Sequence, residues 1–162
     1  MRKLIDRYYR LLNAMLVVTV AILVVPVTIQ ILSRHTPWVP TLIWTEEMAR
    51  FLFIWMIMIG AMVGIRDGAH FDVDLWPELP PRVNALLRIV ADLFVLVMAL
   101  VFIWYGIRFV QFGWDQTSEL AELPMVWIFI SWPLAGFTWV VFLGERFLAN
   151  LRLIAATDKA AS

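Results

Sequence analysis

The chain has 162 residues, of which 62% are hydrophobic and 16% are charged, and its mean hydropathy is +0.82. Soluble domains are about 45–50% apolar and about 25% charged, so this composition excludes an ordinary soluble domain. Its 13 basic and 13 acidic residues cancel, and it has no cysteine. These facts argue against a nucleic-acid partner and exclude disulfide scaffolds, cysteine-ligated zinc and iron–sulfur clusters.

Four stretches are apolar enough to cross a membrane, which takes roughly 20 helical residues. We predict spans over 11–33, 46–66, 88–110 and 124–145. The fold class is therefore all-α, a polytopic membrane protein whose residues 1–162 form one domain of four transmembrane helices. A soluble four-helix bundle would need a polar face on every helix, and the first span has none. That span is also longer than the apolar core of a cleaved signal peptide.

The distribution of Lys and Arg predicts the orientation. With the N-terminus inside, ten of the 13 basic residues lie on the inner side, and Arg34, Arg50 and Arg108 lie outside. Four spans then place both termini in the cytoplasm. The last outer loop carries Asp115, Glu119 and Glu122 and no basic residue.

The start of the second span carries a charged motif. Glu46 and Glu47 precede Arg50 by four and three residues, so both carboxylates can flank its guanidinium on a helix. One interpretation is a helix start, with Thr45 as the cap and two acids at the positive end of the helix dipole. The other is a polar contact with a second protein. An ion-binding site is disfavoured, because the arginine would repel a cation.

The inner half of the second span has a stripe of small residues, Gly60, Gly64 and Gly68. Such a stripe lets another helix approach closely. Packing against the first or third span of the same chain is the favoured interpretation, and packing against another subunit is the alternative.

Asp92 is the acidic residue that lies clearly inside a span. Because the second and third spans are antiparallel, it lies at the depth of Gly64, close to Arg66 and one turn from Arg88. We expect an ion pair near the inner surface rather than a proton relay, because a relay needs further polar groups across the membrane.

No catalytic constellation is visible, so the chain is not expected to be an enzyme. His35 and His70 both fall in connections between the predicted spans, which excludes a haem held by two histidines within spans. His70 has acidic neighbours, but one histidine among solvated acids is more typical of a polar loop than of a metal site. Trp55 lies deep in the second span, where a broad contact with a membrane partner would suit it.

These residues resemble the small membrane subunit, often called Q, of the tripartite ATP-independent periplasmic (TRAP) transporters. The resemblance covers nearly the whole chain in length and four-span layout, and its specific part is 44–74. Weaker similarity follows at Leu123, Pro124 and Pro133. The specific part rests on Trp44, Glu46, Glu47, Ala49, Arg50, Phe53, Trp55, Gly60, Arg66, Gly68, His70, Val73 and Asp74.

The resemblance implies a bacterial inner-membrane subunit without catalytic residues, metal or cofactor. Its implied partners are membrane lipid, a large membrane subunit (M) and a periplasmic substrate-binding protein (P). The large subunit is implied to be an elevator-type carrier that holds the sodium and organic-acid sites. The interface residues that we expect are Trp44, Glu46, Glu47, Arg50, Trp55, Gly60, Gly64, Gly68, Arg66, His70, Asp115, Glu119 and Glu122.

Three other functions were weighed. A stand-alone small four-helix exporter typically relies on an acid in its first span, and 11–33 has none. A quinone-linked redox subunit would need histidines within the spans. An assembly subunit of another membrane complex is distinguished from the favoured function only by the resemblance.

Overall fold

The computed structural model describes residues 2–36, 42–67 and 81–161. It contains the helices α1 (Arg2–His35), α2 (Trp44–Asp67), α3 (Pro81–Gly113), α4 (Val126–Phe129) and α5 (Ser131–Ala161). Within these described ranges no strand occurs, and an isolated bridge joins Thr117 to Pro124. The predicted all-α class is confirmed. Gly68 and His70 lie outside the described residues.

Four segments are long and apolar enough to cross a membrane: Lys3–His35, Trp44–Asp67, Leu86–Gly113 and Val126–Phe147. This confirms the predicted number of spans. The first and third helices extend beyond 11–33 and 88–110, because charged residues at the ends of a span interrupt its hydropathy but not its helix. The cytoplasmic location of the termini stays a prediction.

The fourth span is not the single helix predicted over 124–145. α4 ends at Phe129 and α5 begins at Ser131. Pro133 has no amide hydrogen to donate to the carbonyl of Phe129, so the helical ladder is interrupted one turn before the proline. The Ser131 hydroxyl donates to the Ile128 carbonyl at 2.6 Å and satisfies one carbonyl at the break.

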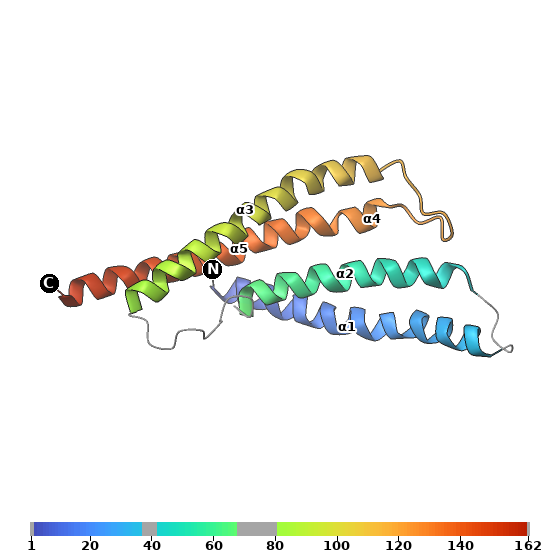
Figure 1. Ribbon diagram of the computed structural model, residues 1–162, viewed down its shortest axis with the longest axis horizontal. Coiled ribbons are helices and arrows are strands. Elements are labelled where there is room, and N and C mark those ends of the chain that lie inside the picture. Colours follow the sequence, from blue (N-terminus) through green and yellow to red (C-terminus); the bar gives the residue numbers. More distant parts are fainter. Residues whose placement is uncertain (1, 37–41, 68–80, 162) are drawn as a thin grey trace.

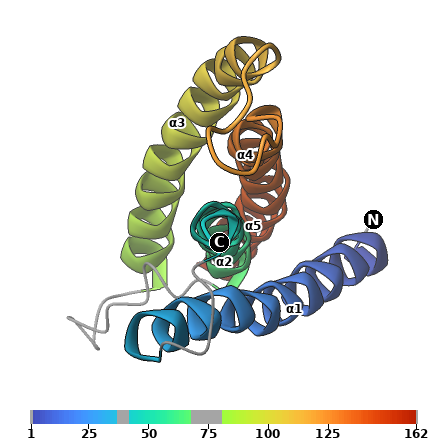
Figure 2. The same cartoon turned by 90° about the vertical axis from the view of Figure 1, so that its right-hand side faces the viewer.

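The long helices pack in the order α1, α2, α5, α3 (Figures 1 and 2). α5 is thus inserted between α2 and α3, and over the described residues neither α1 nor α2 packs along α3. In the apolar window of α5, 50% of the residues are buried, against 6% in α1. The chain is therefore an open wall with a central helix, and much of α1 and α3 is left for lipid or another protein.

The closest helix contact is the seam between α3 and α5. Ala99, Gly106 and Gly113 follow one another at intervals of seven residues on α3 and are buried, which places them on one face. A Cβ atom on Gly106 would lie 2.7 Å from Pro133, and one on Gly136 would lie 2.7 Å from the Ala99 carbonyl oxygen. These glycines let the two helices touch through their backbones.

Candidate functional site

The carboxylate of Glu47, at the start of α2, is bound to the loop that joins α3 to α4. We call this loop the outer loop, and the two ends of the wall outer and inner, after the predicted orientation. It accepts hydrogen bonds from the backbone amides of Leu120, at 3.1 Å, and Ala121, at 2.6 Å. The Ser118 hydroxyl faces the same carboxylate. Glu47 is buried, with 6% of its surface exposed, so this acid fastens the outer loop to α2.

The outer loop has a defined conformation. The Ser118 amide donates to the Leu123 carbonyl at 2.8 Å, and the Met125 amide donates to the Gln116 carbonyl at 2.9 Å. Glu122 adopts φ of 52°, in the left-handed region that reverses the chain. The fold of this loop directs the amides of its tip at Glu47.

The expectation that Glu46 and Glu47 both flank Arg50 is confirmed for Glu46, whereas the hydrogen bonds of Glu47 go to the outer loop. Arg50 pairs with Glu46 at 3.7 Å, and both side chains are more than 60% exposed. Thr45 is not the cap, because α2 begins at Trp44; the Thr45 hydroxyl instead donates to the Leu42 carbonyl at 2.6 Å. The charged motif splits into a buried anchor and an exposed ion pair.

The predicted interface residues that stay exposed at the outer end gather around that ion pair and the loop. Trp44 is 47% exposed, and the acids of the loop are exposed as well. We call this set the outer rim, and it consists of Trp44, Glu46, Arg50, Asp115, Glu119 and Glu122.

Trp55 makes a contact within the chain. Its indole nitrogen donates to the carbonyl of Trp127 at 3.0 Å, and its side chain is half-buried. It therefore ties α2 to the start of the α4–α5 span, which the sequence pattern did not reveal.

Arg66 is the centre of a second cluster at the opposite end of the wall. It donates to the Ile5 carbonyl at 2.8 Å and to the Asp6 carboxylate, and it lies 3.9 Å from Glu145. Its guanidinium also covers the Tyr9 ring, at 4.7 Å from the centroid. One arginine of α2 thus joins α1 and α5.

Arg146 of α5 extends this inner cluster to α3. It donates to the Ile65 carbonyl at 3.1 Å and lies 3.5 Å from the Asp92 carboxylate. The expectation that Asp92 lies near Arg66 is corrected, because α3 packs on α5 rather than on α2. The expectation of a paired acid at this end is confirmed, with Arg146 as the partner and the predicted Arg88 nearby.

The expected packing of the α2 glycine stripe within the chain is confirmed for Gly60, which faces α1, but this is not a close backbone contact. A Cβ atom on Gly60 would meet Leu16 of α1 at 3.9 Å, an ordinary distance that does not require glycine. Gly64 is half-buried. The sequence pattern that indicates the close contact between α3 and α5 is the seven-residue spacing of Ala99, Gly106 and Gly113.

Between the two ends, the spans carry no charge over 11–33, 51–65, 93–107 and 131–144. Within the part of the chain that the structure describes, no three His, Asp or Glu side chains are grouped so that they could hold a metal ion. The charges lie at the two membrane faces, where they fasten the helices together. This arrangement is suited to packing and docking.

The sequence model of one family, described as "Tripartite ATP-independent periplasmic transporters, DctQ component", matches residues 23–153. The chain belongs to this family. Its match covers the four spans apart from the first part of α1. The resemblance inferred from 44–74 is confirmed.

Several curated relatives are transporter permease proteins. An isethionate TRAP transporter permease protein, DctMQ, of Oleidesulfovibrio alaskensis is 29% identical over 72% of this chain and 19% of its own length. A sialic acid TRAP transporter permease protein, SiaT, of Haemophilus influenzae is 33% identical over 64% of this chain and 17% of its own length. The sialic acid TRAP transporter small permease protein SiaQ of Vibrio cholerae is 25% identical over 100% of this chain and 92% of its own length. The chain thus spans less than a fifth of the first two relatives and nearly all of the third.

Proposed function

We propose that this chain is the non-catalytic small subunit of a sodium-coupled TRAP transporter that imports an organic acid across the bacterial inner membrane. It scaffolds a large elevator-type membrane subunit and contributes to the surface on which a periplasmic binding protein docks. The observation that carries the proposal is the family match over four spans that form an open wall. Neither a cofactor nor a sodium site is assigned to this chain.

The open wall supports the scaffolding part of the proposal. A self-contained carrier needs a polar path across the membrane, whereas the charges here lie at the two ends of the wall. The exposed side chains of α1 and α3 are large and apolar along both helices. A membrane partner that covers one of these faces would extend the wall.

The lengths of the relatives support a large membrane partner. In DctMQ and SiaT the segment similar to this chain occupies less than a fifth of a longer permease protein. The same unit is therefore part of a longer polypeptide in some relatives and a separate small permease in another. This is expected of a subunit that functions beside a larger permease subunit.

The substrate class rests on the names of the relatives. Isethionate, sialic acid and C4-dicarboxylates are all organic anions near neutral pH. The substrates differ although the matched segments are all 25–33% identical to this chain. We infer that selectivity belongs to the other subunits, and that this chain meets them at the outer rim.

A charge swap tests whether the outer rim recognises a partner. The full transporter is expressed with Arg50→Glu alone, or with Glu46→Arg and Arg50→Glu together, which rebuilds the ion pair with its charges exchanged. We expect both variants to retain the large subunit during purification but to lose binding-protein-dependent uptake. Recovery of uptake in the double variant would mean that this ion pair only stabilises the start of α2 and does not recognise a partner.

The scaffolding role is tested separately. The tagged chain, purified in mild detergent from cells that make all the subunits, should retain the large permease subunit in a fixed ratio. Quantitative mass spectrometry of the purified sample measures that ratio. Loss of the large subunit in detergents that leave this chain folded would contradict the role.

A further inference from the structure

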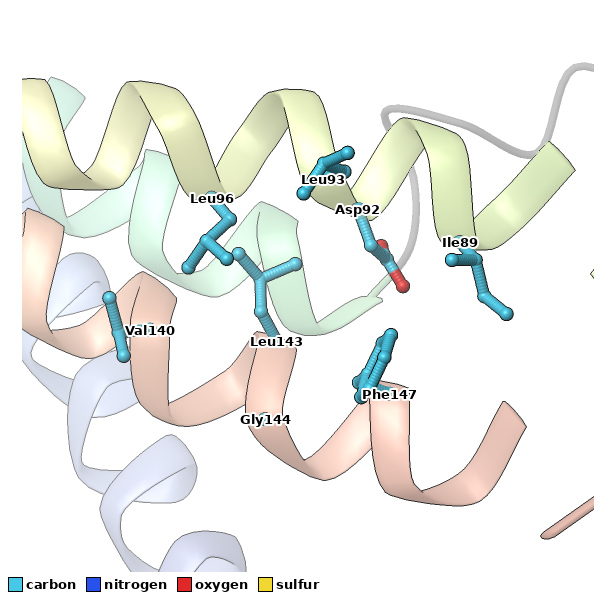
Figure 3. Close-up of a pocket in the computed structure, with 8 residues that line it drawn as sticks. All are labelled: Ile89, Asp92, Leu93, Leu96, Val140, Leu143, Gly144 and Phe147. Carbon is cyan, nitrogen blue, oxygen red and sulfur yellow. The ribbon is translucent and has the colours of Figure 1, made fainter. Parts of the chain in front are cut away.

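A groove opens between α3 and α5 near the inner end of the wall (Figure 3). Its volume is about 310 Å³, at the lower end of the range of about 300–1,000 Å³ found for small-molecule sites. Leu93 and Leu96 line it from α3, and Leu143 and Phe147 line it from α5. Leu93 and Phe147 are both exposed, so the groove faces outward to the membrane.

Asp92 is the charged side chain that points into this apolar groove (Figure 3). It is 4% exposed, and both of its carboxylate oxygens are buried without a hydrogen bond. Arg146 lies 3.5 Å away and offsets the charge, yet it leaves both oxygens without a donor. A buried acceptor without a donor is costly, so a ligand that brings N–H groups would be favoured here.

The position of Asp92 along α3 matches that of a lipid head group at the edge of the apolar layer. The uncharged run of α3 begins at Leu93, so Asp92 lies at the boundary of the apolar part of this helix. A phospholipid in the adjoining leaflet would thus lay an acyl chain along the apolar lining, with its head beside the carboxylate.

The charges select among lipid heads. Asp92 faces Arg146 of α5 at 3.5 Å, and Arg88, one turn away on α3, adds a second positive charge nearby. A zwitterionic head with a primary ammonium complements both groups, with its ammonium at Asp92 and its phosphate at Arg146. A trimethylated ammonium carries no N–H donor, and an anionic head brings no ammonium to Asp92.

We propose that the α3–α5 groove is a binding site for an amine-headed phospholipid such as phosphatidylethanolamine. The ammonium donates to Asp92, and one acyl chain fills the space beside Gly144 and Leu143. This inference rests on the chain's own side chains and does not depend on the proposed function.

The test uses the full chain, purified in mild detergent with any subunit that accompanies it and then delipidated. Thermal unfolding and native mass spectrometry are measured with phosphatidylethanolamine, phosphatidylcholine and phosphatidylglycerol that carry the same acyl chains. We expect phosphatidylethanolamine to be retained about tenfold better than the other two, the ratio that one charge-assisted hydrogen bond gives. Equal retention of the three lipids would overturn the proposal.

Two variants probe the two parts of the site. Gly144→Leu is designed to fill the groove, since Gly144 lines it and a Cβ atom there meets nothing within 4 Å. Asp92→Asn keeps the shape and removes the charge. Val97→Leu is the control, because it adds bulk at an exposed position of α3 that does not line the groove.

The lipid preference should disappear in both Gly144→Leu and Asp92→Asn and persist in the control. Persistence in Gly144→Leu would overturn the groove as the site, and persistence in Asp92→Asn would overturn the assignment of the head. A photoreactive residue at Leu93 should capture lipid. Capture of a membrane protein there instead would assign the groove to a protein contact and overturn the proposal.

Discussion

The backbone contact between α3 and α5 leads to a quantitative prediction at Gly136. A Cβ atom there would lie 2.7 Å from the Ala99 carbonyl oxygen and 2.8 Å from a side-chain carbon of Ile103. The first contact is with backbone, which cannot move without shifting α3. Gly136→Ala should therefore push the two helices apart.

The matched control is Gly144→Ala, in the same helix, where a Cβ atom meets nothing within 4 Å. Both changes gain the same helix propensity, about 1 kcal/mol, so it cancels in the comparison. Overpacking costs about 1–3 kcal/mol. Gly136→Ala should be less stable than Gly144→Ala by that amount, or about 5- to 150-fold in the ratio of folded to unfolded protein.

Both variants are unfolded by heat in the same mild detergent. For a chain of this length, 1 kcal/mol corresponds to roughly 2–4 °C in the melting temperature. The chain has no cysteine, so a pair of cysteines introduced across the α3–α5 seam reports its spacing by disulfide formation, which should slow in Gly136→Ala. Equal melting temperatures and equal cross-linking rates in the two variants would refute the close contact.

Three further predictions concern the ends of the wall. Glu47→Gln should speed hydrogen exchange at the loop amides it binds, whereas Glu46→Gln should not, and equal exchange in both would contradict the anchor. Arg66→Gln should lower the free energy of unfolding by about 1.5–3 kcal/mol, the range for a hydrogen bond to a charged group. Denaturant titration measures this loss. The control is Glu46→Gln, which removes an exposed ion pair worth at most about 0.5 kcal/mol. A cysteine replacing Glu119 should react with an impermeant thiol reagent in intact cells and one replacing Arg7 should not, and the reverse pattern would invert the orientation.

The spans were predictable from the sequence because uncharged runs of sufficient length have few alternatives to a membrane helix. The order of the helices was not. The antiparallel direction of the second and third spans puts Asp92 at the depth of Arg66, but α5 lies between α2 and α3. The small residues of α3 at intervals of seven, ending at Gly113, carried a signal for this packing.

The contacts at the outer end of the wall were only partly predictable from the sequence. The spacing of Glu46, Glu47 and Arg50 limits which pairs can form on a helix. It does not say that a loop more than 70 residues away supplies two amides to Glu47. That contact depends on the reversal of the chain at Glu122, which is set by tertiary structure rather than by a local pattern.

The central claim is that this wall serves a neighbouring carrier and moves no substrate by itself. The direct measurement is sodium-driven uptake of a labelled organic acid into proteoliposomes that contain this chain alone, the large subunit alone, or both, each with the binding protein outside. We predict uptake only when both membrane subunits are present. Uptake by vesicles that contain this chain alone would contradict it.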